Sequence, residues 1–335
     1  MKHRKLTRYL ISLVMILIIV GLAEWTDEKE ILFPEMTALI IGLLIIDKRV
    51  WNVKRWQIIL LMTLGAAVGI CIVRYSPLPY VVNLCAAFAF AGASLLISRA
   101  TLIPLISACV LPVLLHTESI VYPIAVFSMS VSVVLVQIIL EKCGIRNRMP
   151  KTVGRKPGKE DIIRWLILFC FVGALAELAV GMDYPYIILP PLMVTFVEMV
   201  NSKAGFRNRP TQVFLFLTTA ATLGTVLQIV GHHHLHLPES IVALTIAAIL
   251  FLIFEWTGKY FAPSGALAFI PMLLPQEGLA WLPLEASIGA ALFITIAMVV
   301  FQKCYKWNRA QLIFCATPTL LREYMNRKKR KKQIE

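Results

Sequence analysis

The chain has 335 residues, of which 59% are hydrophobic and 16% are charged. Soluble domains carry about 25% charged residues, so this composition excludes an ordinary soluble fold. The net charge of +14 would indicate a nucleic-acid partner in a soluble protein. Here the Lys and Arg residues lie between long apolar runs, so we predict a membrane protein whose partner is the lipid bilayer and not nucleic acid.

The apolar runs are long enough to cross a hydrocarbon core of about 30 Å. They lack the alternating pattern of barrel strands, so they are predicted to be helices. The first run, 9–25, follows a basic N-terminus and resembles a signal peptide, but 21–25 makes a poor cleavage site and the run is predicted to be retained. Twelve spans are predicted: about 9–25, 31–47, 56–74, 79–98, 100–116, 119–141, 162–181, 186–201, 212–231, 238–256, 260–275 and 283–303.

The connections between these spans alternate in charge. Nearly all Lys and Arg residues lie in every second connection and at the two ends of the chain, whereas the other connections carry mainly Asp and Glu. By the positive-inside rule, both termini are predicted to be cytoplasmic. The localisation predicted for such a multi-pass chain is the plasma (cytoplasmic) membrane.

The chain matches itself when it is shifted by about 156–160 residues, which predicts an internal duplication. An even number of spans in each half predicts two six-helix repeats that lie the same way up. The matching segments are 21–24 with 174–177, 32–36 with 188–192, Arg99 with Lys259, and 110–118 with 269–277. The predicted units are a first repeat (1–142), a basic cytoplasmic linker (143–161), a second repeat (162–305) and a basic cytoplasmic tail (306–335).

No nucleotide-binding, metalloprotease or nucleophile-elbow motif is present in the sequence. We therefore predict neither an enzyme nor a cofactor. The seven cysteines form no CxxC pair and indicate neither a disulfide framework nor a zinc site.

Two spans, 100–116 and 260–275, each carry two prolines eight residues apart and follow one basic residue. Proline-broken spans at matching positions in two halves indicate a transport site, and a helix start beside a cation favours an anion. The predicted substrate-binding residues are Arg99, Pro104, Lys259, Pro263, Ser264 and Gly265. The alternative is that the prolines only kink tightly packed helices and that the two basic residues are ordinary cytoplasmic charges.

Carboxylates within the spans are a second set of candidates, because a charge inside the bilayer is costly. Glu177 lies about one turn inside its span and is the predicted proton-coupling residue. The alternative is that it reaches out to the membrane surface. Glu35 and Glu198 lie in the short spans that open with proline, near opposite ends of the membrane, which weakens both as candidates.

Two further features lie outside the spans. His232 and His236 could share a helical face and bind a metal, but we expect a polar loop end there and no metal site. The basic tail, 306–335, is predicted to lie on anionic lipids of the cytoplasmic leaflet.

The segment 262–268, Ala-Pro-Ser-Gly-Ala-Leu-Ala, resembles the signature of the HPP family of integral membrane proteins, which is His-Pro-Pro followed by a small residue, Gly and Ala. Phe261-Ala262-Pro263 stands here in the place of His-Pro-Pro. The chain thus resembles a duplicated, divergent HPP-like unit, which implies a small anion as solute. The first four spans also look like the membrane domain of FUSC-type aromatic acid exporters, which implies an anionic organic molecule.

These features together predict a transporter or permease for a small solute, with a preference for anions and a site between the two repeats. The first alternative is a non-transporting membrane component, such as an assembly, sensory or partner-binding subunit. A membrane-embedded enzyme is the second alternative, and it would require a cluster of acid, base or metal-binding residues at one depth.

Overall fold

The computed structural model describes residues 2–148, 156–201 and 209–302. Within these ranges the chain is helical and contains no β-strand, so the predicted all-α fold is confirmed. The predicted lipid-binding tail, 306–335, lies outside the described residues, as does the segment 149–155 of the predicted linker.

Eight helices of the described chain are long and apolar enough to cross a membrane. They are α1 (Lys2–Thr26), α3 (Arg55–Tyr75), α4 (Tyr80–Ser98), α6 (Val121–Lys142), α7 (Lys159–Gly181), α9 (Pro210–Leu227) with its continuation η5 (Gln228–His234), α10 (Glu239–Thr257) and α13 (Leu282–Gln302). Only 28% to 44% of the residues in the most apolar stretch of each helix are buried. Apolar side chains therefore face outward on all eight helices, as expected of helices that contact lipid.

The other four predicted spans correspond to short helices. They are α2 (Glu35–Ile40) with its continuation η2 (Ile41–Ile45), α5 (Leu105–Leu115), α8 (Pro190–Asn201) after η3 (Pro185–Ile188), and α11 (Ala262–Phe269) with its continuation η6 (Ile270–Leu273). The 11 residues of α5 extend only about 17 Å at 1.5 Å per residue, which is about half of a hydrocarbon core. The twelve predicted spans are thus eight long helices and four that are too short to cross a membrane alone.

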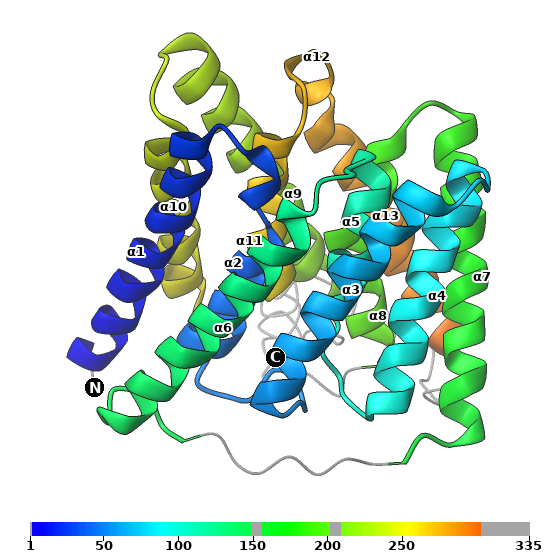
Figure 1. Ribbon diagram of the computed structural model, residues 1–335, viewed down its shortest axis with the longest axis horizontal. Helices are drawn as coiled ribbons and strands as arrows, with labels where there is room; N and C mark the ends of the chain where they lie inside the picture. Colours follow the sequence, from blue (N-terminus) through cyan, green and yellow to red (C-terminus); the bar gives the residue numbers. More distant parts are fainter. Residues whose placement is uncertain (1, 149–155, 202–208, 303–335) are drawn as a thin grey trace, which may run out of the picture.

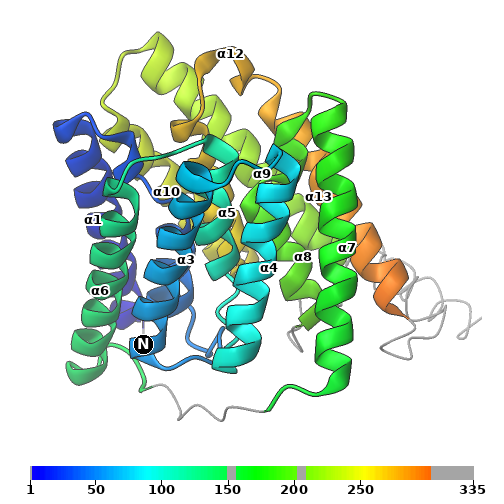
Figure 2. The same cartoon turned by 45° about the vertical axis from the view of Figure 1, so that its right-hand side comes forward.

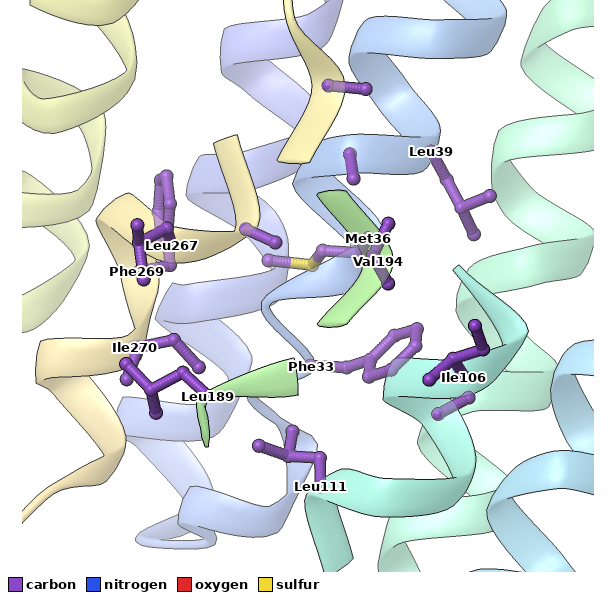
Figure 3. Close-up of a cluster of buried hydrophobic side chains, with 14 of the residues drawn as sticks. Phe33, Met36, Leu39, Ile106, Leu111, Leu189, Val194, Leu267, Phe269 and Ile270 are labelled. Carbon is purple, nitrogen blue, oxygen red and sulfur yellow. The ribbon is translucent and has the colours of Figure 1, made fainter. Parts of the chain in front are cut away.

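The short helices are the interior of the protein. Every residue of α2, η2 and α11 is buried, as is all of α5 up to Leu114 and all of α8 up to Val200. Figure 1 shows α2, α8 and α11 in the middle of the molecule, between α1 and α10 at one side and α4 and α7 at the other. Apolar side chains from all four short helices meet there, with Met36, Ile106, Val194 and Leu267 among them (Figure 3).

Helices from the two halves of the chain pack directly against each other. Helix α1 packs against α10 and α4 packs against α7, as Figures 1 and 2 show. In the interior, α2 packs against α11 and α5 packs against α8. The two halves therefore form one helical body. Two short helical turns, η1 (Lys29–Ile31) and α12 (Gln276–Leu279), lie in the connections.

Two glycines let the outer helices approach the short ones closely. A Cβ atom on Gly69 of α3 would lie 2.4 Å from the carbonyl oxygen of Cys109 in α5. A Cβ atom on Gly224 of α9 would lie 2.1 Å from the carbonyl oxygen of Ala268 in α11. Small residues at such contacts are typical of helices packed in membranes. Only glycine fits at these two positions without displacing a backbone.

A carboxylate of α1 caps the start of α10. Glu24 Oε1 accepts a hydrogen bond from the backbone N–H of Glu239 at 3.0 Å, and Oε2 accepts from the backbone N–H of Ser240 at 3.2 Å. The Ser240 hydroxyl donates to the same oxygen at 2.8 Å. Because the first N–H groups of a helix lack partners within it, this carboxylate stabilises α10 and fixes it to α1.

Candidate functional site

A small cavity lies where the four short helices meet. The centre of a water molecule can occupy a volume of about 10 Å³ in it, so the cavity has room for about one water. The lining comes from α2, the connection before α3, α5 with the proline before it, α8 and α11: Glu35, Ala38, Trp51, Pro104, Ser107, Pro191, Val194, Glu198, Ala262, Pro263 and Ala266. The polar side chains among these are two glutamates, one serine and one tryptophan, and the rest are apolar.

Prolines set where the short helices begin. Pro104 directly precedes α5, and Pro263 lies in the first turn of α11, where the N–H that proline lacks would have no helical partner. These two prolines therefore start helices. The sequence pattern had suggested that they interrupt a helix, and the structure shows no kink at either of them. Pro112 does lie inside α5. Proline has no N–H to donate to the carbonyl of Ala108. The hydroxyl of Tyr122 in α6 donates to that carbonyl instead, at 3.2 Å.

Glu35 is a carboxyl group buried without a partner. It is the first residue of α2 and is 1% exposed, and neither of its oxygens has a hydrogen-bond partner among the described residues. The hydroxyl of Ser107 lines the same cavity and lies near the Glu35 carboxyl, but the two do not form a well-aligned hydrogen bond. Burying a polar group without a hydrogen bond costs about 2–7 kcal/mol, and an ionised carboxylate costs far more. This carboxyl is therefore expected to be neutral or to hold a ligand.

Glu198 is the second carboxyl group at the cavity and is 4% exposed. Its Oε1 accepts a hydrogen bond from the indole Nε1–H of Trp51 at 3.1 Å. Trp51 lies in the connection between η2 and α3, and its ring covers Gly42, where a Cβ atom would lie 2.5 Å from the ring. This glycine gives the indole room to reach Glu198.

The other predicted residues of α11 pack against their surroundings. Ser264 is fully buried, and its hydroxyl donates to the carbonyl of Phe261 at 2.7 Å. Gly265 lies against α2, where a Cβ atom would be 2.4 Å from Ile41 Cδ1 and 3.1 Å from Thr37 Cγ2. Of the four non-basic residues predicted for the site, Pro104 and Pro263 line the cavity. Ser264 bonds within the start of α11, and Gly265 lets α11 approach α2.

Arg99 and Lys259 lie outside the cavity. Arg99 ends α4 in the left-handed conformation, with φ of 55°, and its exposed side chain borders a separate pocket of about 390 Å³ between α4, α7 and α8. Lys156, Arg164, Glu160 and Asp161 border the same pocket, so cations and carboxylates are mixed there. Lys259 is half-buried before α11, and burial together with the nearby Arg209 lowers its pKa.

Glu177 is exposed on α7 and does not line the cavity. The sequence had singled it out over Glu35 and Glu198, which the structure brings to one cavity. Depth along a span does not reveal which face of a helix points inward. The spacing of the residues therefore could not distinguish Glu177 from the two glutamates that line the cavity. Trp51 was missed as well, and the available signal was a bulky aromatic residue in a strongly basic connection.

The histidine cluster belongs to the end of η5. His232 Nδ1 lies 3.0 Å from the carbonyl oxygen of Leu237, and its Nε2 lies 3.6 Å from Glu239 Oε1. His236 follows in a left-handed turn with φ of 51°. Within the described residues, no three His, Cys, Asp or Glu side chains lie close enough together to hold a metal ion. In the structure, these histidines contact the connection to α10.

Comparison of the chain with known protein families, with characterised proteins and with solved structures finds no match.

Proposed function

We propose that this chain is a multi-pass membrane transporter or permease for a small solute, with its site at the central cavity. The observation that carries the proposal is that two buried glutamates line a cavity where four short helices meet inside eight long ones. Discontinuous helices that begin near the middle of the membrane are typical of solute sites in transporters. Ionisable residues inside a membrane protein are costly and usually functional.

The two-repeat organisation is part of this proposal, and the packing supports it. The contacts of α3 with α5 and α6 are matched by those of α9 with α11 and α13. The contact of α1 with α10 is matched by that of α7 with α4, and that of α2 with α11 by α8 with α5. In each match, every helix of one half is replaced by the corresponding helix of the other half. This is the pattern expected for two related units around one axis.

The lining of the cavity also supports two repeats. Residues at matching places in the two halves line it in pairs: Glu35 with Pro191, Ala38 with Val194, Pro104 with Pro263, and Ser107 with Ala266. The close contacts of Gly69 and Gly224 with the short helices are a further matched pair. A site between two repeats is therefore the arrangement we propose.

The proposed orientation has both termini in the cytoplasm of a cell whose plasma membrane holds the protein. Helices α1 and α7 begin at the lower edge of Figure 1, where α4 ends and α3 begins, and the basic connection 48–55 leads into α3 at this edge. This grouping of Lys and Arg supports the assignment of this edge to the cytoplasmic side of the membrane. Membership of an HPP-like family is proposed only on the sequence resemblance at 262–268.

The cavity favours a cation or a proton-exchanging solute over the anion that the sequence suggested. The basis for an anion was the charge of Arg99 and Lys259, and neither residue lines the cavity. Among the described residues, the ionisable groups that line it are carboxyl groups. Carboxylates repel an anion and stabilise a positive charge or a hydrogen-bond donor.

A non-transporting membrane component is the second candidate, and the size of the cavity favours it. Room for about one water is too little for an organic solute. A transporter must therefore adopt further conformations in which the cavity opens to each side of the membrane in turn. A sensory or assembly subunit would keep the interior closed.

Cysteine accessibility separates these two candidates without knowledge of the solute. Ser107→Cys is introduced into a variant whose seven cysteines have been replaced, and membrane vesicles of both orientations are treated with a membrane-impermeant thiol reagent. Ser264→Cys is the matched control, because both serines are 0% exposed but only Ser107 lines the cavity. A transporter predicts labelling of Ser107→Cys from both sides and little labelling of the control. No labelling from either side would favour the closed subunit.

A further inference from the structure

The pocket between α4, α7 and α8 lies next to the central cavity. Three pairs of residues, each one or two positions apart in the chain, are divided between the two spaces. The first of each pair lines the cavity and the second borders the pocket: Trp51 and Asn52, Pro104 and Ile103, and Glu198 and Val200. Because neighbouring Cα atoms are about 3.8 Å apart, the wall between the two spaces is about one layer of residues thick.

The pocket is much larger than the cavity and opens to the surface. Its volume is about 390 Å³ against about 10 Å³, and the side chains of Arg99, Lys156 and Glu160 at its border are exposed. It lies where α4 ends and α7 begins, at the lower edge of Figure 1, which the proposed orientation assigns to the cytoplasm. A solute in the cytoplasm can therefore reach the wall of the cavity through this pocket.

Trp51 occupies this wall. It is the bulkiest of the side chains that line the cavity and is 4% exposed, although the next residue, Asn52, borders the open pocket. The indole Nε1–H donates to Glu198 Oε1, so the side chain reaches from the connection before α3 across to α8. These are two of the three segments that form the wall, and the indole joins them.

The backbone around Trp51 is fixed more firmly than its side chain. Arg49 donates to the carbonyl of Trp51 at 3.0 Å and to that of Val53 at 2.8 Å. The backbone N–H of Asn52 donates to Thr101 Oγ1 at 2.7 Å, and its carbonyl accepts from the N–H of Thr101 at 3.2 Å. The indole has a single N–H donor, so its rotation away from the wall breaks one hydrogen bond and leaves the backbone in place.

We propose that the pocket is the cytoplasmic entrance of the central cavity and that Trp51 is the residue that closes it. Rotation of the indole away from Glu198 joins the two spaces and admits the solute. This role rests on the proposed function, because an entrance requires a transported solute, whereas the position of Trp51 in the wall does not. Arg99 and Glu160 place both signs of charge at the mouth, so selection by charge falls to the carboxyl groups of the cavity.

The rate of cysteine labelling tests this barrier. Trp51→Ala is combined with Ser107→Cys in the variant whose other cysteines have been replaced, and a small, membrane-impermeant thiol reagent is applied to each side of the membrane. A separate Thr101→Cys variant identifies the side on which the pocket opens, because this exposed residue borders the pocket. From that side, Trp51→Ala should make labelling of Ser107→Cys at least about tenfold faster, because opening no longer breaks a hydrogen bond or displaces a ring.

Phe33→Ala is the matched control, since it also truncates a buried aromatic side chain. Phe33 is 0% exposed, packs against Tyr122 of α6 and lines neither the cavity nor the pocket. Its truncation should leave the labelling rate from the pocket side unchanged. Should Trp51→Ala not fold, Trp51→Leu takes its place, because leucine also lacks the hydrogen bond and is much smaller than the indole.

The proposal is overturned if truncation of Trp51 leaves labelling from the pocket side unchanged, or if Phe33→Ala accelerates it equally. Transport is judged separately, from Ser107→Cys with Trp51 intact. Labelling from the pocket side only after truncation of Trp51 would keep Trp51 as the barrier and reject transport. Labelling from both sides with Trp51 intact, at a rate that its truncation does not change, would support transport and place the entrance elsewhere.

Discussion

The contact between α9 and α11 can be tested by adding a single methyl group. In Gly224→Ala the new Cβ would lie 2.1 Å from the carbonyl oxygen of Ala268 and 3.1 Å from Pro271 Cγ. Ordinary van der Waals contact begins at about 3.4 Å, so α9 and α11 must separate by about 1 Å. The obstacle is backbone and cannot move away by rotating a side chain.

The expected cost follows from two opposing effects. Overpacking costs about 1–3 kcal/mol, and a backbone obstacle places Gly224→Ala near the upper end. Alanine regains about 0.5–1 kcal/mol through its greater helix preference. The net loss is therefore about 2 kcal/mol, from an estimate of about 3 less about 1. Gly69→Ala should behave in the same way, because its Cβ would lie 2.4 Å from the carbonyl oxygen of Cys109.

Thermal unfolding of the purified protein measures these changes, with Gly21→Ala as the matched control. Gly21 lies inside α1, more than one turn before its end, and its Cβ would meet nothing nearer than Ser240 Cβ at 3.9 Å. Only the helix preference then acts, so Gly21→Ala should leave the melting temperature unchanged or raise it. Gly224→Ala should lower it. A Gly224→Ala protein as stable as the Gly21→Ala protein would refute the close approach of α9 to α11.

Three further predictions concern stability and ligand binding. Tyr122→Phe leaves a buried carbonyl of α5 without its donor and is expected to cost about 1–3 kcal/mol; an unchanged melting temperature would contradict this role of the hydroxyl. Glu24→Ala removes three hydrogen bonds at the start of α10 and should cost about 0.5–2 kcal/mol, as for other helix caps; equal thermal stability of variant and parent would count against the cap. The third prediction concerns a thermal-shift screen over cations, amines and organic anions. Glu198→Gln should abolish any stabilisation by a solute, whereas Arg99→Ala and Lys259→Ala should not. The opposite pattern would indicate that the solute binds at the basic residues.

Hydropathy located the helices well but could not give their lengths. A helix buried inside other helices and a helix in contact with lipid are both apolar, so the run 100–116 was predicted to be one span. In the structure, residues 100–104 are not helical and α5 begins at Leu105. The signal for this boundary was Pro104, because proline is favoured at a helix start and disfavoured inside.

The residues of the site were harder to predict than the helices. The proline pattern singled out two of the four short helices, α5 and α11, and Pro104 and Pro263 line the cavity. The sequence could not indicate that Glu35 and Glu198 line a cavity and Glu177 does not, because it gives the depth of each residue along its span and not the face on which it lies. The contact of Trp51 with Glu198 joins residues 147 positions apart, and no local pattern in the chain predicts it.

The cavity is symmetric in its scaffold and asymmetric in its chemistry, if the two-repeat organisation holds. Glu35 is matched by Pro191 and Ser107 by Ala266, so each of these two polar residues of the lining has an apolar residue at the matching position of the other half. A duplicated scaffold alone would be as stable, or more stable, with apolar residues at all four places, because burial of the Glu35 carboxyl costs several kcal/mol. Packing therefore gives no reason for a glutamate at this position. A role in binding a proton or a cationic solute does give one, and it places the function at the residues where the two halves differ.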